Sequence, residues 1–190
     1  MLLDCNKFVV KSQTLAFSNK KTFEILDSEN GQQLGTAKDT TGFFPALFGV
    51  ANIEVRDSSN NALLFTVGRM GLFLKKDQVL DAQGQLIGRF RVKMFSLSGG
   101  FHVYDKGDKH LMEIQGNMFK AEYKFMTPDR SAEMGSVSRT WGGFAKSLLT
   151  GGDTFGVQVD SKFASDVTAK TLIIGAAIAL ESIFKKKEKA

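Results

Sequence analysis

The chain has 190 residues, of which 43% are hydrophobic and 24% charged, so its composition is that of a globular protein and excludes a disordered one. Its formal net charge of +5 owes much to the lysines in the tail, residues 185–190. No long basic block or aromatic-basic motif accompanies this charge, so we expect no nucleic-acid partner. The length suits a single domain over residues 1–190.

The residue types favour β structure in a reducing compartment. Seventeen phenylalanines and 19 glycines indicate a large apolar core and many tight turns. Cys5 is the one cysteine of the chain and cannot form an internal disulfide. We interpret it as a half-buried thiol rather than an acylation site, and we expect a cytoplasmic protein without a leader.

A strand-turn-strand phrase recurs along the chain. Its copies begin at Phe23, Ile53, Gln78, His102, Tyr123 and Phe155. Each copy places an aspartate at the end of an alternating apolar run, and these are Asp27, Asp57, Asp81, Asp105, Asp129 and Asp160. Such an aspartate predicts a turn, because its carboxylate caps nearby backbone amides. We therefore expect six turn residues, not a catalytic set, and about six hairpins with twelve mostly antiparallel strands.

The last apolar segment, TLIIGAAIALESIF at 171–184, predicts a helix over about 164–184, capped by Ser165 or Asp166 and followed by the basic tail. A helix that is apolar on nearly every face is buried on all sides or lies in lipid, and its uncharged run of ten residues is short for a membrane span. A twelve-stranded barrel is too wide for its own side chains to fill. We therefore predict a mainly β fold, a closed antiparallel barrel of about twelve strands around this hydrophobic helix. The residues predicted to be buried are Leu172, Ile173, Ile174, Ile178, Leu180 and Ile183.

The C-terminal part of the chain resembles a known family. GSVSRTWGGFAKSLLTGGDTFGVQV, followed after a short polar link by DVTAKTLIIGAAIALESIF, is similar to the C-terminal half of phospholipid scramblases. FHVYDKGDKHLMEIQG resembles the VYD-type hairpins of that family. GDTFGVQV and ALESI are also similar to the LURP-one-related family. Both families belong with Tubby C-terminal-like domains, so the resemblance implies the same barrel around a central helix.

The resemblance implies a scramblase-like protein that binds an anionic phospholipid surface peripherally, at the cytosolic face of membranes such as the plasma membrane. It also implies a role in transbilayer phospholipid movement, which requires no covalent catalysis, so we expect no enzyme. The alternative is a soluble LURP-one-related scaffold for interactions or stress responses, with a protein partner. The acylated extension of animal scramblases has no counterpart here, so we expect no anchorage by that route. The sequence carries no signal for an oligomeric state.

The proposed calcium segment of scramblases aligns with residues 151–162. Here Gly151 and Lys162 stand at acidic positions, and Asp153 remains. Calcium takes six to eight oxygen ligands, several of them carboxylates. We therefore expect no cofactor, with Asp153 either a weak calcium candidate or a turn residue.

Two segments are candidates for lipid contact. Arg89, Arg91 and Lys93 alternate with apolar residues and place three cations on one strand face, with Lys75 and Lys76 nearby in sequence. Such a face suits phosphate headgroups, although a solvated sheet face has the same pattern. The apolar stretch GFFPALFGV at 42–50 suits an interfacial loop or else a hydrophobic strand.

His102 and His110 flank one predicted turn, with Asp105 and Asp108 beside them. The two histidines are expected to approach each other across a hairpin, but a zinc site needs three or four ligands in fixed geometry. We interpret them as surface strand residues. The sequence has no Gly-rich phosphate loop and no nucleophile elbow, so it predicts neither an ordinary hydrolase nor a kinase.

Overall fold

The computed structural model describes residues 1–14, 21–42, 50–70, 76–92, 100–117, 122–139 and 154–187. The strands in these residues are β1 (Lys7–Thr14), β2 (Lys21–Asp27), β3 (Gln33–Asp39), β4 (Ala51–Asp57), β5 (Leu63–Met70), β6 (Lys76–Asp81), β7 (Leu86–Val92), β8 (Gly100–Tyr104), β9 (His110–Asn117), β10 (Glu122–Met126), β11 (Glu133–Ser138) and β12 (Thr154–Val159). The helices are the 3-10 helices η1 (Leu2–Asp4) and η2 (Ser161–Phe163) and the α-helix α3 (Val167–Lys187).

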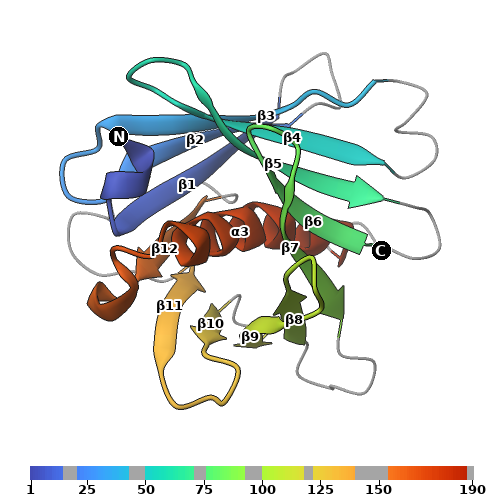
Figure 1. Cartoon of the computed structure of the whole chain (residues 1–190). Helices are drawn as coiled ribbons and strands as arrows, with labels where there is room; N and C mark the ends of the chain where they lie inside the picture. Colours follow the sequence, from blue (N-terminus) through green and yellow to red (C-terminus); the bar gives the residue numbers. More distant parts are fainter. Residues whose placement is uncertain are drawn as a thin grey trace.

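The strands form a closed antiparallel barrel. Each strand pairs with its neighbours in the chain, and β1 pairs with β12 to complete the circle, with Val9 opposite Gly156. Figure 1 shows α3 running through the barrel, with β1 to β4 on one side of it and β8 to β11 on the other. The predicted mainly β fold, a barrel of twelve strands around the C-terminal helix, is therefore confirmed.

The turns at one end of the barrel confirm the role predicted for the aspartates. In five hairpin turns the Oδ1 atom of an aspartate accepts a hydrogen bond from the backbone amide two residues later; these are Asp27, Asp57, Asp81, Asp105 and Asp129. Asp160 instead follows β12 and accepts from the amide of Lys162, which caps η2. The sixth expected hairpin was therefore wrong, and five hairpins flanked by β1 and β12 provide the twelve strands.

The helix α3 fills the barrel. Asp166 caps it as expected, because its Oδ1 accepts from the amide of Ala169 at 2.9 Å, and the helix spans Val167–Lys187 where the sequence predicted about 164–184. Every residue from Ala169 to Leu180 is buried. This stretch includes five of the residues predicted to be buried, namely Leu172, Ile173, Ile174, Ile178 and Leu180. The side chain of Ile183 lies outside the described part of the structure.

The wall of the barrel approaches α3 closely at Gly175. A Cβ atom on this glycine would lie 2.8 Å from Cγ2 of Val79 on β6 and 3.6 Å from Cγ2 of Val67 on β5. The first distance is shorter than a van der Waals contact permits. A small residue is therefore required where the helix faces these strands.

The first residues of the chain are attached to the barrel interior through two polar contacts. Leu2 is fully buried, and its amide donates to Oδ2 of Asp57 at 2.8 Å. The ammonium group of Lys170, at the end of the first turn of α3, donates to the carbonyl oxygen of Leu3 at 2.7 Å, and Lys170 is only 2% exposed. A buried polar group is costly unless it is hydrogen-bonded. These contacts therefore tie η1 to both the sheet and the helix.

Replacing Asp57 by asparagine is expected to lower the free energy of unfolding by about 1 to 3 kcal/mol. Both carboxylate oxygens of Asp57 accept hydrogen bonds, Oδ1 from Ser59 and Oδ2 from Leu2. In asparagine one of these oxygens becomes an NH₂ group, which would face the N–H donor of Ser59 or of Leu2. Chemical denaturation measures the loss. Asp81→Asn is the matched control, since the bonds of its turn all go to Oδ1, and it is expected to change stability by less than about 0.5 kcal/mol.

The effect of Asp57→Asn is expected to depend on pH. Burial acts to raise the pKa of Asp57, but the hydrogen bonds from Ser59 and Leu2 outweigh it, so the pKa is lowered from its ordinary value of 3.8. A lowered pKa in the folded state stabilises the protein above the unfolded value and ceases to do so as the pH falls through the folded value. The difference between wild type and variant is therefore expected to shrink below about pH 4. A difference independent of pH would contradict this assignment.

Candidate anion-binding surface

The structure describes part of the cationic strand face predicted for Arg89, Arg91 and Lys93, and this part lies on β7. Phe90 points into the barrel and is buried, while Arg89 and Arg91 lie on the outer face, as the alternation of the strand predicts. Lys93 and Lys75 lie outside the described residues. Lys76 opens β6, but its side chain lies outside the described part.

A carboxylate from the turn between β8 and β9 lies between the two arginines. Oδ1 of Asp108 accepts from a terminal nitrogen of Arg91 at 2.5 Å and lies 3.3 Å from a terminal nitrogen of Arg89. The same nitrogen of Arg89 donates to the carbonyl oxygens of Asp105 and Lys106, each at 3.2 Å. The turn therefore holds Arg89 through its backbone as well as through Asp108.

Aromatic side chains support Arg91 from the neighbouring strands. Its guanidinium carbon lies 4.7 Å from the ring centroid of Tyr104, a cation-π distance. The ring of Tyr104 lies 5.2 Å from that of His110, which in turn contacts His102. Arg91 thus packs against a row of rings on β8 and β9.

The two histidines lie next to each other across the β8–β9 hairpin, as the sequence suggested. Nδ1 of His102 and Nε2 of His110 are 3.0 Å apart, and the same Nε2 is 3.0 Å from the carbonyl oxygen of Met112. A carbonyl only accepts, so a hydrogen on Nε2 of His110 satisfies both contacts, with Nδ1 of His102 as an acceptor. Within the described residues no group of three or more His, Cys, Asp or Glu side chains could hold a metal ion.

A second ion pair joins β9 to the turn between β10 and β11. Nε of Arg130, in the turn between β10 and β11, lies 2.9 Å from Oε2 of Glu113 on β9, whose side chain is 3% exposed. The sequence interpretation missed Glu113 and Arg130, and it missed the role of Asp108 and Tyr104. A signal was available, because Asp108 and Arg130 occupy turn positions where other copies of the repeat have Gly or Asn.

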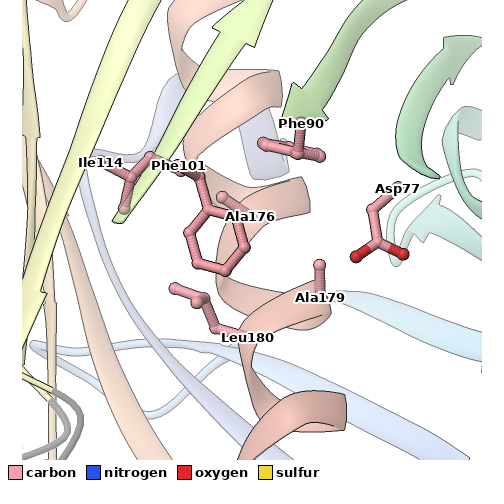
Figure 2. Close-up of a pocket in the computed structure, with 7 residues that line it drawn as sticks. All are labelled: Asp77, Phe90, Phe101, Ile114, Ala176, Ala179 and Leu180. Atoms are coloured by element: carbon pink, nitrogen blue, oxygen red, sulfur yellow. The ribbon is translucent and has the colours of Figure 1, made fainter. Parts of the chain in front are cut away.

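A small apolar pocket separates α3 from the strands. It is lined by Asp77, Phe90, Phe101, Ile114, Ala176, Ala179 and Leu180. Figure 2 shows the aromatic rings on the strand side facing the helix, with the carboxylate of Asp77 at the edge. Asp77 is engaged by Arg69, since Oδ1 lies 2.7 Å from Nε. The volume of the pocket is about 10 Å³, enough for about one water molecule.

The other candidates lie mainly outside the described residues. Asp153 is not among the described residues, and neither are residues 43–49 of the apolar stretch. In the described part of the calcium-like segment, Thr154 is buried in β12 and the carboxylate of Asp160 is engaged in capping η2. With Asp153 itself outside the described residues, the weak calcium site stays a prediction.

The fold defines the class of protein as a closed twelve-stranded barrel threaded by its own C-terminal helix, with paired arginines on its outer face. Among the described helices, none is both long and apolar enough to cross a membrane.

Sequence comparison places this barrel in a family. The family model named Scramblase matches residues 52–186, which is well over half of the chain. The chain therefore belongs to the scramblase family, and the resemblance noted from the C-terminal segments is confirmed.

A curated relative supports this assignment. Phospholipid scramblase family member 5 from Homo sapiens is 22% identical over 118 residues, covering 59% of this chain and 43% of the human protein. The match therefore spans less than half the length of that relative. No solved structure matches the chain.

Proposed function

We propose that this scramblase-like protein binds anionic phospholipid peripherally at the cytosolic face of membranes and takes part in transbilayer phospholipid movement. Membership of the scramblase family, through the match over residues 52–186, is the observation that carries the proposal. The printed name of the human relative, a phospholipid scramblase family member, supports it. Movement of a lipid between leaflets breaks no covalent bond, so the proposed function needs no nucleophile or general base.

The electrostatics of the protein support binding to an anionic surface. The formal net charge is +5, and Arg89 and Arg91 lie together on the outer face of the barrel. A basic residue near an anionic bilayer contributes about 1 kcal/mol to binding. Arginine also presents a planar set of donors that matches phosphate oxygens. We propose Arg89, Arg91 and Lys93 as the residues that contact headgroups, with Lys75 and Lys76 as further candidates.

Liposome flotation tests the proposal. The wild-type protein is expected to float with vesicles of phosphatidylcholine and phosphatidylserine and to stay at the bottom with phosphatidylcholine alone. Alanine at Arg89, Arg91 and Lys93 together is expected to weaken binding about tenfold or more, because three basic residues are lost from the contact. Circular dichroism checks that the variant is folded.

A charge-matched variant separates a local contact from net charge. The control replaces three exposed lysines, Lys7, Lys38 and Lys162. Lys7 and Lys38 lie on β1 and β3, strands distant from β7 in the barrel, and Lys162 lies in η2, which follows β12. Alanine at these three lysines is expected to weaken flotation much less than the arginine variant. Absence of wild-type flotation on anionic vesicles would refute the proposed lipid binding and favour the protein-scaffold alternative.

A further inference from the structure

We propose that Arg89 and Arg91 form a phosphate-binding site that Asp108 occupies, so that a phospholipid headgroup binds there by displacing the Asp108 carboxylate. This inference rests on the proposed function and adds to it a built-in competitor for the headgroup. The site is the outer surface where β7, β8 and the β8–β9 turn meet.

The geometry of Asp108 resembles that of a bound anion. A single oxygen, Oδ1, accepts a hydrogen bond from Arg91 at 2.5 Å and forms an ion pair with Arg89 at 3.3 Å, so two guanidinium groups converge on one point. Guanidinium groups bind carboxylate and phosphate oxygens with the same planar donor geometry. Asp108 joins the two arginines through one oxygen, whereas a phosphate presents several acceptor oxygens. The convergence therefore suits a phosphate at least as well as it suits the carboxylate.

Arg89 has a further N–H donor that Asp108 does not use. Nε of Arg89 is buried and has no hydrogen-bond partner within the described part of the chain. A buried donor without a partner is unfavourable, and a ligand oxygen or an ordered water would satisfy it. Asp108 leaves this donor unused, which is further reason to regard the carboxylate as an incomplete occupant.

The arginines are held by contacts that do not involve Asp108. Arg89 donates to the carbonyl oxygens of Asp105 and Lys106, and Arg91 lies over the ring of Tyr104. These contacts persist when the Asp108 side chain leaves. The site is thus organised before a ligand arrives, which reduces the ordering cost of binding.

The backbone of the turn determines where the carboxylate lies. Five hairpin turns contain a residue with positive φ, and these residues are Gly31, Asn61, Gly84, Asp108 and Arg130. Glycine, asparagine and aspartate accept this conformation more readily than other residues. Asp108, at φ 61°, therefore holds its carboxylate over the arginines from a turn that asparagine at the same position would keep.

The carboxylate of Asp108 is also easy to displace. Its side chain is 60% exposed, and exposed ion pairs contribute little to stability because water screens them. The anionic surface of a membrane raises the local concentration of phosphate groups. Displacement is therefore expected at the bilayer and not in free solution.

The test compares Asp108→Asn with Glu29→Gln. Asparagine tolerates positive φ, so the first variant keeps the turn while removing the charge. Glu29 is exposed in the β2–β3 turn, so the second variant changes the net charge equally at a distant place. Flotation on phosphatidylcholine vesicles containing phosphatidylserine is expected to strengthen about fivefold for Asp108→Asn relative to Glu29→Gln at the same ionic strength. Adding Arg91→Ala to Asp108→Asn is expected to abolish that gain.

The outcomes distinguish competition by Asp108 from the proposed lipid binding. If wild type floats and the two single variants bind equally, Asp108 does not compete with headgroups, and the inference is overturned while the proposed lipid binding stands. If neither wild type nor Asp108→Asn floats, both fail. A gain that survives Arg91→Ala would also overturn the site.

A second arm identifies the source of the phosphate. Inorganic phosphate is titrated into the full-length Asp108→Asn variant without vesicles and followed by calorimetry. Binding much weaker than that of the vesicles supports a lipid headgroup as the ligand. Binding as tight as that of the vesicles would overturn the headgroup and identify free phosphate instead.

Discussion

Replacing Phe65 by alanine is expected to lower the free energy of unfolding by about 3 to 5 kcal/mol. Phe65 on β5 is fully buried, and its Cε2 atom lies 3.8 Å from the place that a Cβ on Gly175 would occupy. Its ring therefore packs directly against the central helix. A closed barrel has little freedom to collapse around a lost ring, so a cavity remains. Urea unfolding followed by circular dichroism measures the loss.

Leu64 provides the matched control for this result. It directly precedes Phe65 on β5, lies where the register of the β4–β5 pair shifts, and is only partly buried against the core. Leu64→Ala is expected to cost less than half as much as Phe65→Ala. Equal losses for the two variants would contradict a core that lies between the helix and the inner face of the barrel.

Gly135→Ala is the second change with a large expected effect, a loss of about 1 to 3 kcal/mol. A Cβ atom on Gly135 would lie 2.4 Å from the backbone oxygen of Gln158 on β12 and 3.0 Å from Cδ1 of Ile173 on α3. The backbone of a paired strand cannot move away without breaking its ladder, and Ile173 is fully buried. Thermal or chemical unfolding measures the effect.

Gly68→Ala tests whether the loss comes from this close contact. Gly68 is also a buried strand glycine, but a Cβ there would lie 3.5 Å from Cγ of Gln78, an ordinary contact distance. Its substitution is expected to change the free energy of unfolding by less than about 0.5 kcal/mol. If Gly68→Ala destabilised the protein as much as Gly135→Ala, the close approach of β12 would not be the cause.

Much of the fold could be predicted because its signals are local. The carboxylate of an aspartate reaches the amide two residues ahead, so the turns at Asp27 and Asp81 follow from neighbouring residues. The alternation around Phe90 likewise places Arg89 and Arg91 on the outer face. Asp160 shows the limit of such signals, since the same short-range cap starts a helical turn there and not a hairpin.

The contacts of the candidate site could be predicted only in part. Alternation predicted that Arg89 and Arg91 share a face, and the hairpin predicted that His102 approaches His110. The repeat indicates the turn position of Asp108 but not its contact with the arginines, because that contact depends on the direction in which the left-handed turn residue projects its side chain. The pairing of Glu113 with Arg130 similarly depends on the register of β9 and β10, which places Met126 opposite Glu113.

The sequence by itself therefore determined five hairpins with their turn residues, the apolar helix and the resemblance to scramblases, because periodicity, turn chemistry and motifs are recorded in adjacent residues. Only the tertiary structure decided that Lys170 is buried and donates to Leu3, that Asp57 holds the amide of Leu2, and that Asp108 occupies the arginine pair. These contacts join residues distant in the chain, or depend on the direction of a single side chain. The contacts of Lys170 and Asp57 form only when the helix, the sheet and the first residues assemble, whereas that of Asp108 also depends on the pairing of β7 with β8.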